Sequence, residues 1–329
     1  MTPLEQALRE RIRRDGPLSV EAYMDACNTF YYATRDPLGA AGDFTTAPEI
    51  SQMYGEMIGA ALADCWHRAG RPGGVRYAEL GPGRGTLAAD ALRTMAAAGL
   101  EPDAIELVET SPLLRAEQTM RLPSAIFHES IEGLADGNGP LLLVASEFFD
   151  ALPVRQTVGG VERRVVVSGG SLAFDRGGAI VETSPARDEA ARQVATLLAH
   201  KGGAALIVDY GHDQAGAVGD TLQAVRGHRF AYPLEHPGEQ DLTAHVDFAA
   251  LAGAARLGGA RVGGPVSQGS WLETLGIAAR ASTLAAKNPA EAEGIAAARR
   301  RLCDEAEMGR LFKVMALAGA EWPMIAGFE

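Results

Sequence analysis

A glycine-rich segment, YAELGPGRGTLAADAL at residues 77–92, constrains the fold more than any other part of the chain. Gly81, Gly83 and Gly85 alternate directly after an apolar run, and a segment of helical character follows. Glycine permits the positive φ angles and the close ligand approach that a tight turn needs. The N-terminus of a following helix adds unpaired N–H groups and the positive end of its dipole. The segment therefore predicts a nucleotide-binding turn between a strand and a helix.

Strands alternate with helices on both sides of this turn, and several of the strands are strongly apolar. The predicted strands are 75–80, 104–109, 125–129, 140–148, 204–211, 260–266 and 311–319. The predicted helices between them are 86–98, 111–121, 187–200 and 244–257. Apolar strands joined by crossover helices are typical of buried parallel sheets. We expect an α/β fold with a Rossmann-like, doubly wound sheet.

Other segments depart from that alternation. Residues 1–70 are predicted to form an N-terminal helical segment, with helices at 4–14, 19–35 and 48–69. We expect residues 71–329 to form the main domain, with two insertions and a long loop at 212–240. Residues 154–183 have short β-rich runs split by Gly-Gly pairs, which predicts an antiparallel segment inserted into the sheet. Residues 268–309 are predicted to form a helical insertion.

Composition excludes several classes of function. The 329 residues carry a net charge of −12, which disfavours nucleic acid as a partner. The three cysteines, Cys27, Cys65 and Cys303, have neither metal-ligand nor disulfide spacing, so we expect no metal and a reduced compartment. We expect no membrane span, because no long apolar run occurs, and no secretory signal. These features predict a cytoplasmic location and leave both a monomer and a homodimer open.

The spacing of the glycines separates three nucleotide classes. A phosphate-binding P-loop needs Lys after its last glycine, but Gly85 is followed by Thr86 and Leu87. In a dinucleotide fingerprint the third glycine would stand where Thr86 stands, so NAD and FAD are the weaker interpretation.

The remaining match is the acid-x-G-x-G-x-G loop of class I S-adenosylmethionine (SAM) methyltransferases, which Glu79, Gly81, Gly83 and Gly85 resemble position by position. Glu109 ends the next predicted strand, where a carboxylate can accept both ribose hydroxyls. Ser130 and Ile131 follow the third strand, and in this fold that position flanks the adenine.

Seven ordered motifs extend this likeness over nearly the whole chain. They are GDFTTAPEISQMYGEMIG (42–59), ELGPGRGTL (79–87), SEFFDALPV (146–154), LIVDYG (206–211), DLTAHVDF (241–248), SQGSWLETLGI (267–277) and MGRLFKVMAL (308–317). Together they resemble the MidA / NDUFAF7 family of class I SAM-dependent methyltransferases. The resemblance implies SAM as cofactor, S-adenosylhomocysteine as product, and added N-terminal helices with a β insertion. Mitochondrial members are linked to assembly of respiratory complex I and methylate an arginine of a core subunit, which implies a protein substrate here.

Arginine methylation makes a specific demand on acidic residues. The guanidinium group is always charged, and a carboxylate that binds it can localise the charge and orient one nitrogen. Glu147 ends a very apolar predicted strand, beside the expected methyl group of the cofactor, and Asp150 follows one turn later. Asp43 and Glu49 lie in the first motif. Turn and helix-start roles are alternatives for these two, and the motif does not say which of the four acids contacts substrate.

Two other functions remain open on the same fold. The chain could methylate a small molecule, because a fold does not fix a substrate. It could also act as an assembly chaperone that binds SAM without catalysis. The intact glycine loop together with Glu109 argues against a loss of cofactor binding.

Overall fold

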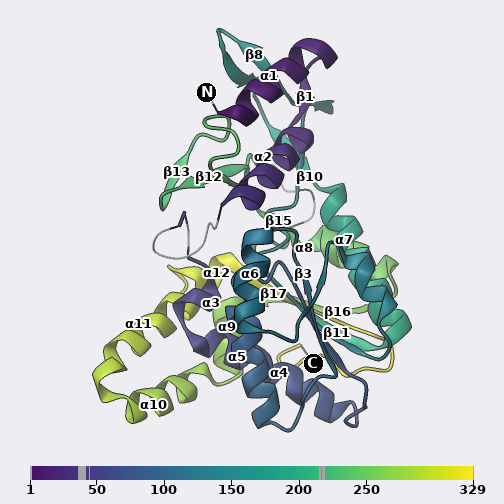
Figure 1. Cartoon of the computed structure of the whole chain (residues 1–329), viewed down its shortest axis with the longest axis vertical. Coiled ribbons are helices and arrows are strands. Elements are labelled where there is room, and N and C mark those ends of the chain that lie inside the picture. The colour runs from purple at the N-terminus through teal and green to yellow at the C-terminus, as the bar shows by residue number, and fades with distance from the viewer. Residues whose placement is uncertain (1, 36–41, 44, 215, 217–218, 329) are drawn as a thin grey trace.

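A mixed sheet forms the centre of the lower part of the molecule in Figure 1. The computed structural model describes residues 2–35, 42–43, 45–214, 216 and 219–328. Within these residues the strand order is β16 (Arg261–Ser267), β17 (Phe312–Ala318), β11 (Gly203–His212), β5 (Leu141–Ser146), β2 (Arg76–Leu80), β3 (Ala104–Val108) and β4 (Ile126–His128). β17 runs antiparallel to both of its neighbours, and the pairs from β11 to β4 are parallel. The predicted α/β, doubly wound fold is confirmed.

Helices cover both faces of this sheet because alternate strand residues point to opposite sides. Leu142 and Val144 of β5 pack in one hydrophobic cluster, and Leu141 and Leu143 pack in another. The first cluster includes residues of α4 (Gln52–Arg68), α5 (Thr86–Ala97) and α9 (Gln268–Thr274). The second includes residues of α7 (Pro185–Lys201) and α8 (Phe248–Leu257). The apolar strand sequences are therefore explained by burial on both faces.

A smaller part of the molecule stands above the sheet in Figure 1, and we call it the cap. It consists of residues 2–34, 154–183 and 222–244, whose apolar side chains form a third hydrophobic cluster. Its helices are α1 (Pro3–Asp15) and α2 (Val20–Thr34). The boundary at residue 70 stays a prediction. The hydrophobic clusters group α4 with the sheet and α1 and α2 with the cap.

The β insertion lies in the cap and not in the central sheet, so that part of the prediction is wrong. Its strands are β6 (Arg155–Val158), β7 (Val161–Glu162), β8 (Arg164–Ser168), β9 (Ser171–Phe174) and β10 (Ile180–Thr183). In the described part of the chain they form two small sheets, β10-β6-β7 and β1-β8-β9, where β1 is Leu18–Ser19. Gly159–Gly160 and Gly169–Gly170 all have positive φ and close two-residue hairpins. The two hairpins, β6–β7 and β8–β9, each gain a third strand from elsewhere, β10 and β1.

The prediction of a long loop at 212–240 is wrong for part of that range, because two strands lie within it. The range contains β12 (Gln223–Arg226) and β13 (Arg229–Ala231), and β14 (Asp241–Thr243) pairs with β12. Gly227 and His228 form the turn between β12 and β13, with φ of 55° and 61°. Positive φ is uncommon for a residue other than glycine, so the sequence does not predict this turn.

Two predicted helices have different boundaries in the structure, because N-cap residues set where each helix begins. The helix predicted from residue 244 begins at Phe248, because the Asp247 carboxylate accepts from the N–H groups of Ala249 and Ala250, both at 3.0 Å. The helix predicted over 48–69 is divided at Ser51 into α3 (Ala47–Ile50) and α4. Ser51 is extended and caps α4 with its side chain.

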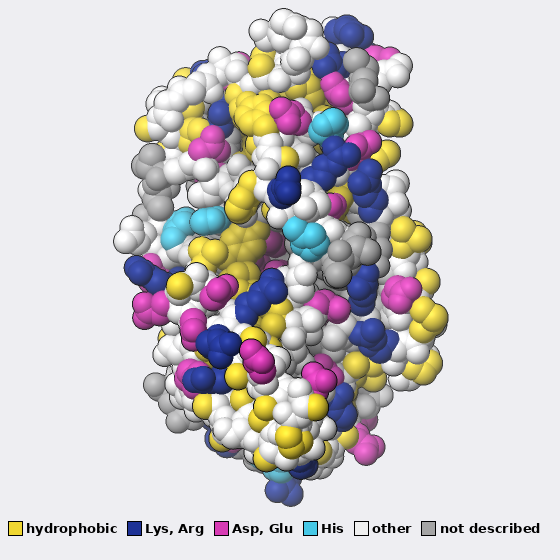
Figure 2. Space-filling model, turned by 90° about the vertical axis from the view of Figure 1, so that its left-hand side faces the viewer, with side chains coloured by type: hydrophobic (Ala, Val, Ile, Leu, Met, Phe, Trp, Pro, Cys, Tyr) yellow, Lys and Arg dark blue, Asp and Glu magenta, His cyan; other side chains and the backbone are white. Residues whose placement is uncertain are grey.

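The surface is hollowed between the cap and the sheet layers, as Figure 2 shows. None of the described helices is long and apolar enough to cross a membrane. Residues 268–309 form α9, α10 (Ile277–Lys287), α11 (Ala292–Cys303) and α12 (Met308–Leu311).

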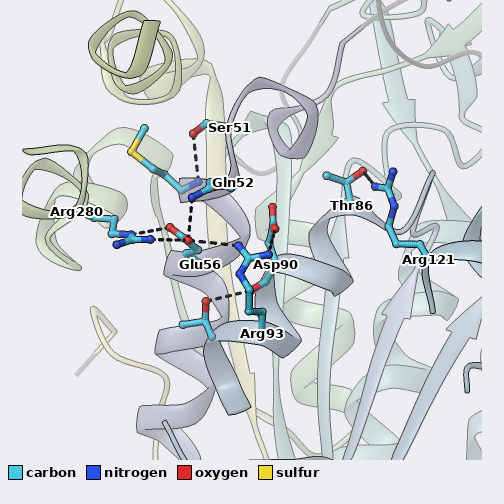
Figure 3. Close-up of polar contacts among 10 residues, drawn as sticks. Ser51, Gln52, Glu56, Thr86, Asp90, Arg93, Arg121 and Arg280 are labelled. Atoms are coloured by element: carbon cyan, nitrogen blue, oxygen red, sulfur yellow. Dashed lines mark hydrogen bonds and ion pairs between the residues drawn. The ribbon is translucent and has the colours of Figure 1, made fainter. Parts of the chain in front are cut away.

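The buried Glu56 of α4 holds these C-terminal helices against the sheet layer. Arg280 of α10 donates to both of its carboxylate oxygens at 2.8 Å, and Arg93 of α5 donates at 3.3 Å (Figure 3). Gln52 adds a further hydrogen bond at 3.3 Å. This buried carboxylate is therefore matched by two arginines that are partly exposed.

Candidate active site

A cavity of about 730 Å³ lies between the cap and the carboxyl ends of β2, β3 and β5. We call its two sides the sheet wall and the cap wall. The sheet wall consists of Glu79, Gly81, Gly83, Thr86, Glu109, Ser130, Ile131 and Glu147. The cap wall consists of Asp25, Asn28, Thr29 and Tyr32, all on α2. Ligands of doubly wound sheets bind outside the carboxyl ends of the strands, and the cavity is at that edge.

The glycine turn forms the centre of the sheet wall. Gly81, Gly83 and Gly85 have φ of 61°, 54° and 74°, which is why each position favours glycine. The Gly81 N–H donates to the Val108 carbonyl at 3.0 Å and fixes the turn to β3. A Cβ atom on Gly81 would lie 3.1 Å from Cδ2 of Phe148, so the backbone stays bare beside the cavity. With α5 beginning at Thr86, the turn fits a nucleotide-derived ligand.

Glu79 places a buried carboxyl group at the same point. It is 2% exposed and accepts a hydrogen bond from the Tyr77 hydroxyl at 2.7 Å. Burial raises the pKa of Glu79 to about 8. The carboxylate form is costly here until a positive charge arrives, so the position favours a cationic part of a ligand.

Glu109 follows β3 and is held in place by two donors. The Ser111 N–H donates to it at 2.7 Å, and the Gln118 side chain donates at 3.3 Å. Gln118 also donates to the Gly83 carbonyl at 2.6 Å and so joins Glu109 to the glycine turn. Burial raises the pKa of Glu109. Sequence reasoning missed Gln118. A glutamine one turn after the buried Leu114, on the inward face of α6 (Pro112–Arg121), is the signal that could have found it.

Glu147 stands at the end of β5 in an unusual backbone conformation. Its φ is 55°, and its N–H donates to the Val208 carbonyl at 2.9 Å. Its carboxylate accepts from the Ala47 N–H at 3.0 Å. Burial, with the nearby Asp150, raises the pKa of Glu147 to about 8. A non-glycine residue held at positive φ stores strain, and such strain is concentrated at functional sites.

Asp150 lies behind this wall and is absent from the described residues that line the cavity. It is 5% exposed, and its Oδ1 atom has no hydrogen-bond partner among the described residues. Burial raises the pKa of Asp150 and of the neighbouring Asp209. The Asp209 carboxylate accepts from the N–H groups of Phe149 and Asp150 at 2.9 and 3.1 Å. The buried Arg187 donates to main-chain carbonyls of residues 149, 150, 244 and 245.

The two acids of the first motif have different surroundings. Glu49 lines the cavity and accepts from the Thr86 hydroxyl at 2.5 Å, and Arg121 in turn donates to Thr86 (Figure 3). Asp43 is not among the described lining residues. Its carboxylate accepts from the Tyr31 hydroxyl and the Gly227 N–H, each at 2.6 Å. Asp43 therefore ties α2 to the turn between β12 and β13.

The cap wall was missed by sequence reasoning. Asp25, Asn28, Thr29 and Tyr32 recur at helical spacing and form one polar stripe of α2, which is the signal that could have found them. Asn28 donates to the carbonyls of Ala151 and Leu242 at 2.9 and 2.7 Å, and so joins the cap wall to the segment after β5 and to β14 of the cap.

Most of the charged side chains that line the cavity are acidic. Among the described lining residues, eight are acidic, and Arg84 is the one lysine or arginine. The acids are Asp25, Glu49, Glu79, Glu109, Glu129, Glu132, Glu147 and Glu189. Such a cavity attracts cations and repels anions.

Comparisons with known proteins agree with this geometry. A family model for S-adenosyl-L-methionine-dependent methyltransferases matches residues 57–175 and 162–266. The chain is 34% identical to the mitochondrial protein arginine methyltransferase NDUFAF7 homolog of Drosophila melanogaster, over 95% of this chain and 84% of that protein. It is 36% identical to the mitochondrial protein arginine methyltransferase NDUFAF7 of Danio rerio, over 85% of this chain and 78% of that protein.

Solved structures extend the likeness to three dimensions. A Burkholderia thailandensis protein bound to S-adenosyl-homocysteine has a TM-score of 0.84 at 28% identity, over 96% of this chain and 91% of that chain. A native structure from the same organism has a TM-score of 0.81 at 29% identity. The predicted cofactor class is confirmed by these findings.

One prediction is overturned by the same comparisons. The relatives from Drosophila melanogaster, Danio rerio and Mus musculus are named mitochondrial, so the predicted cytoplasmic location is wrong. That prediction rested on the charged N-terminus and the unpaired cysteines. Neither feature distinguishes one reducing compartment from another.

Proposed function

The chain belongs to this family of S-adenosyl-L-methionine-dependent methyltransferases, and from that premise we propose that it methylates an arginine side chain of a protein. The observation that carries the proposal is the lining of the cavity, which includes eight acidic residues and one arginine among the described residues. A guanidinium stays positively charged at every physiological pH and therefore suits an acidic cavity. The relatives' name, protein arginine methyltransferase, supports arginine as the substrate class.

The sheet wall is assigned to the cofactor. In this proposal the N–H groups of the glycine turn and the buried Glu79 hold its methionine part. The Glu109 carboxylate accepts from the ribose hydroxyls, and Gln118 keeps it oriented. Ser130 and Ile131 flank the adenine. Backbone groups and short side chains at strand ends suit this task, because the cofactor is the same for every substrate of the family.

Glu147 is assigned to the reacting group. SAM supplies an activated methyl group on a positively charged sulfur. The Glu147 carboxylate binds the guanidinium and orients one nitrogen toward that carbon, and orientation is the main requirement of such a displacement. The nitrogen that gains the methyl group must lose one proton. Glu147 can accept that proton, because its pKa of about 8 is near the working pH.

Glu49, Asp150 and Asp43 take supporting positions. Glu49 lines the cavity beside Thr86 and faces the cofactor end of the glycine turn. Asp150 adds negative charge behind Glu147, which strengthens the attraction for a cation. Asp43 ties α2 to the cap hairpin, so its contribution is to hold the cap wall in place.

The proposal is tested by labelling. The purified protein is incubated with SAM that carries a radioactive methyl group, together with a lysate from a strain that lacks this chain. We expect one labelled protein band, whose acid hydrolysate contains methylated arginine. The Gly83→Val protein, which should not bind SAM, serves as the control in which no band becomes labelled. Label that appears only in small molecules, or as methylated lysine, overturns the arginine assignment.

A further inference from the structure

The half-buried Tyr32 and the buried Asp241 form a pair on the cap side of the cavity. Tyr32 is on α2 and lines the cavity that Glu147 also lines. Its hydroxyl donates to Oδ1 of Asp241 at 2.7 Å, across 209 residues of sequence. Asp241 is on β14 and is 4% exposed. The pair therefore joins α2 to a strand that arrives much later in the chain.

The hydrogen bond fixes what Tyr32 presents to the cavity. A tyrosine hydroxyl has one proton and two lone pairs, and the proton of Tyr32 is committed to Asp241. Its oxygen can therefore only accept from a ligand. Both N–H donors of the neighbouring Asn28 are used by the carbonyls of Ala151 and Leu242. This stretch of the cap wall presents acceptors and negative charge.

The charge around the pair has the same sign on both walls. Burial, with the nearby Asp150, raises the pKa of Asp241 to about 7, and Asp241 contributes to the raised pKa of Glu147. The three acids therefore lie close enough to influence each other. A guanidinium carries five N–H donors in one plane and no acceptor, so it matches acceptors on two sides at once.

We propose that Tyr32, supported by Asp241, is a second anchor for the substrate guanidinium on the wall facing Glu147. This inference rests on the arginine function proposed above. Glu147 binds one edge of the planar group, and the Tyr32 oxygen accepts from a nitrogen at another edge. Two anchors at different edges hold the planar group more firmly than one carboxylate does. A lysine ammonium is a point charge without such a plane, so it gains less from the second anchor.

The test uses two adjacent tyrosines of α2. Tyr32→Phe removes the proposed anchor. Tyr31→Phe is the matched control, because Tyr31 also donates to an aspartate, Asp43, at 2.6 Å but is not among the described lining residues. The probe is a pool of degenerate peptides with a fixed central arginine, and a second pool has lysine at that position. Methyl transfer from labelled SAM is measured at saturating SAM, and SAM affinity is measured separately by calorimetry.

We expect Tyr32→Phe to lower kcat/KM on the arginine pool about 10-fold, mainly through KM, the scale of one hydrogen bond to a charged group. SAM affinity should stay within about twofold, because the sheet wall is unchanged. Tyr31→Phe removes a bond that supports the cap wall but no lining oxygen, so any loss of kcat/KM should be equal on the two peptide pools. The preference for the arginine pool over the lysine pool should fall in Tyr32→Phe alone.

Each result decides between the two proposals. A wild-type protein that labels neither arginine peptides nor any arginine of a lysate protein overturns the function and this inference together. A wild type that labels arginine peptides, with Tyr32→Phe equal to Tyr31→Phe, overturns the second anchor and leaves the function intact. If Tyr32→Phe does not fold, Asp241→Ala replaces it, because alanine removes the acceptor that holds the tyrosine proton. A folded Asp241→Ala protein with a normal kcat/KM on the arginine pool overturns the inference.

Discussion

The two walls of the cavity are built in different ways. The sheet wall consists of a main-chain turn and of side chains that directly follow β2, β3, β4 and β5. The cap wall consists of side chains on one face of α2, supported by β14 from the far end of the chain. The strand ends of a doubly wound sheet meet at one edge, so their residues are neighbours whatever else the chain contains. The cap wall exists only because the cap folds as it does.

This difference teaches how such a protein can divide its tasks. A wall made of backbone and strand ends is suited to a constant ligand, the cofactor. A wall of exchangeable side chains on a helix can be adapted to one substrate without disturbing the sheet. Asn28 joins the cap wall to the segment after β5 by its hydrogen bond to the Ala151 carbonyl, whereas its hydrogen bond to the Leu242 carbonyl lies within the cap. The predictions below test this division, from the largest expected effect to the smallest.

Gly83→Val should remove SAM binding and leave the fold largely intact. A branched side chain is strained at a φ of 54°, and it would occupy space where the backbone meets the ligand. We expect affinity to fall by more than about 100-fold, to the point where calorimetry records no heat. Circular dichroism checks that the variant is folded. Wild-type SAM affinity in a folded variant would remove the cofactor role from the sheet wall.

Glu147→Gln should lower the methylation rate about 100-fold and change SAM affinity much less. The substitution keeps the shape of the side chain but removes the charge that orients the guanidinium and the base that accepts its proton. Single-turnover rates on one identified arginine substrate measure the effect, with SAM affinity measured in parallel. A normal rate would shift the role to Glu49, which also lines the cavity, or to Asp150 behind it.

The same division explains what could be predicted from the sequence. The doubly wound sheet follows from the alternation of apolar strands and helices, and the glycine turn identifies its ligand-binding edge. Glu79 and Glu109 are found because each is a few residues from a strand end. Tyr32 and Asp241 are not, because their pairing depends on how α2 packs against β14 across 209 residues. No local periodicity encodes that contact.

Two further residues show the limits of a motif. Asp43 stands in a stretch that resembles the family, yet its carboxylate is occupied by Tyr31 and Gly227. In this motif Asp43 therefore attaches parts of the cap to each other and is not among the described residues that line the cavity. His228 stands in a hairpin turn that the sequence did not predict, because positive φ is uncommon for a residue other than glycine. The β12–β13 pair was therefore predicted as loop.

The acids between the walls should make stability depend on pH when no ligand is bound. Glu79 and Glu147 have a pKa of about 8 in the folded chain, and Asp241 has one of about 7. An acid with a raised folded pKa binds protons better in the folded state, so stability falls as pH rises from about 4 toward these values. We expect the melting temperature to drop by several degrees between pH 5 and pH 8. Added SAM should reduce the drop, because its positive charges compensate the carboxylates. A melting temperature that rises over this range would contradict the assignment.

The smallest effect compares Glu147 with Glu56, two buried carboxyl groups that differ in their partners. Glu56 is matched by Arg93 and Arg280, whereas Glu147 accepts a hydrogen bond from the Ala47 N–H. Glu56→Gln loses charge-assisted hydrogen bonds to two partly exposed arginines, so it should destabilise the protein by about 2 kcal/mol. Glu147→Gln removes a charge that burial disfavours, so at pH 8.5 it should stabilise the ligand-free protein by about 1 kcal/mol. Denaturant unfolding at that pH measures both variants. Opposite signs would mean that Glu147 is kept for a bound cation at some cost to the fold, and equal signs would mean that the acid between the walls is an ordinary structural carboxylate.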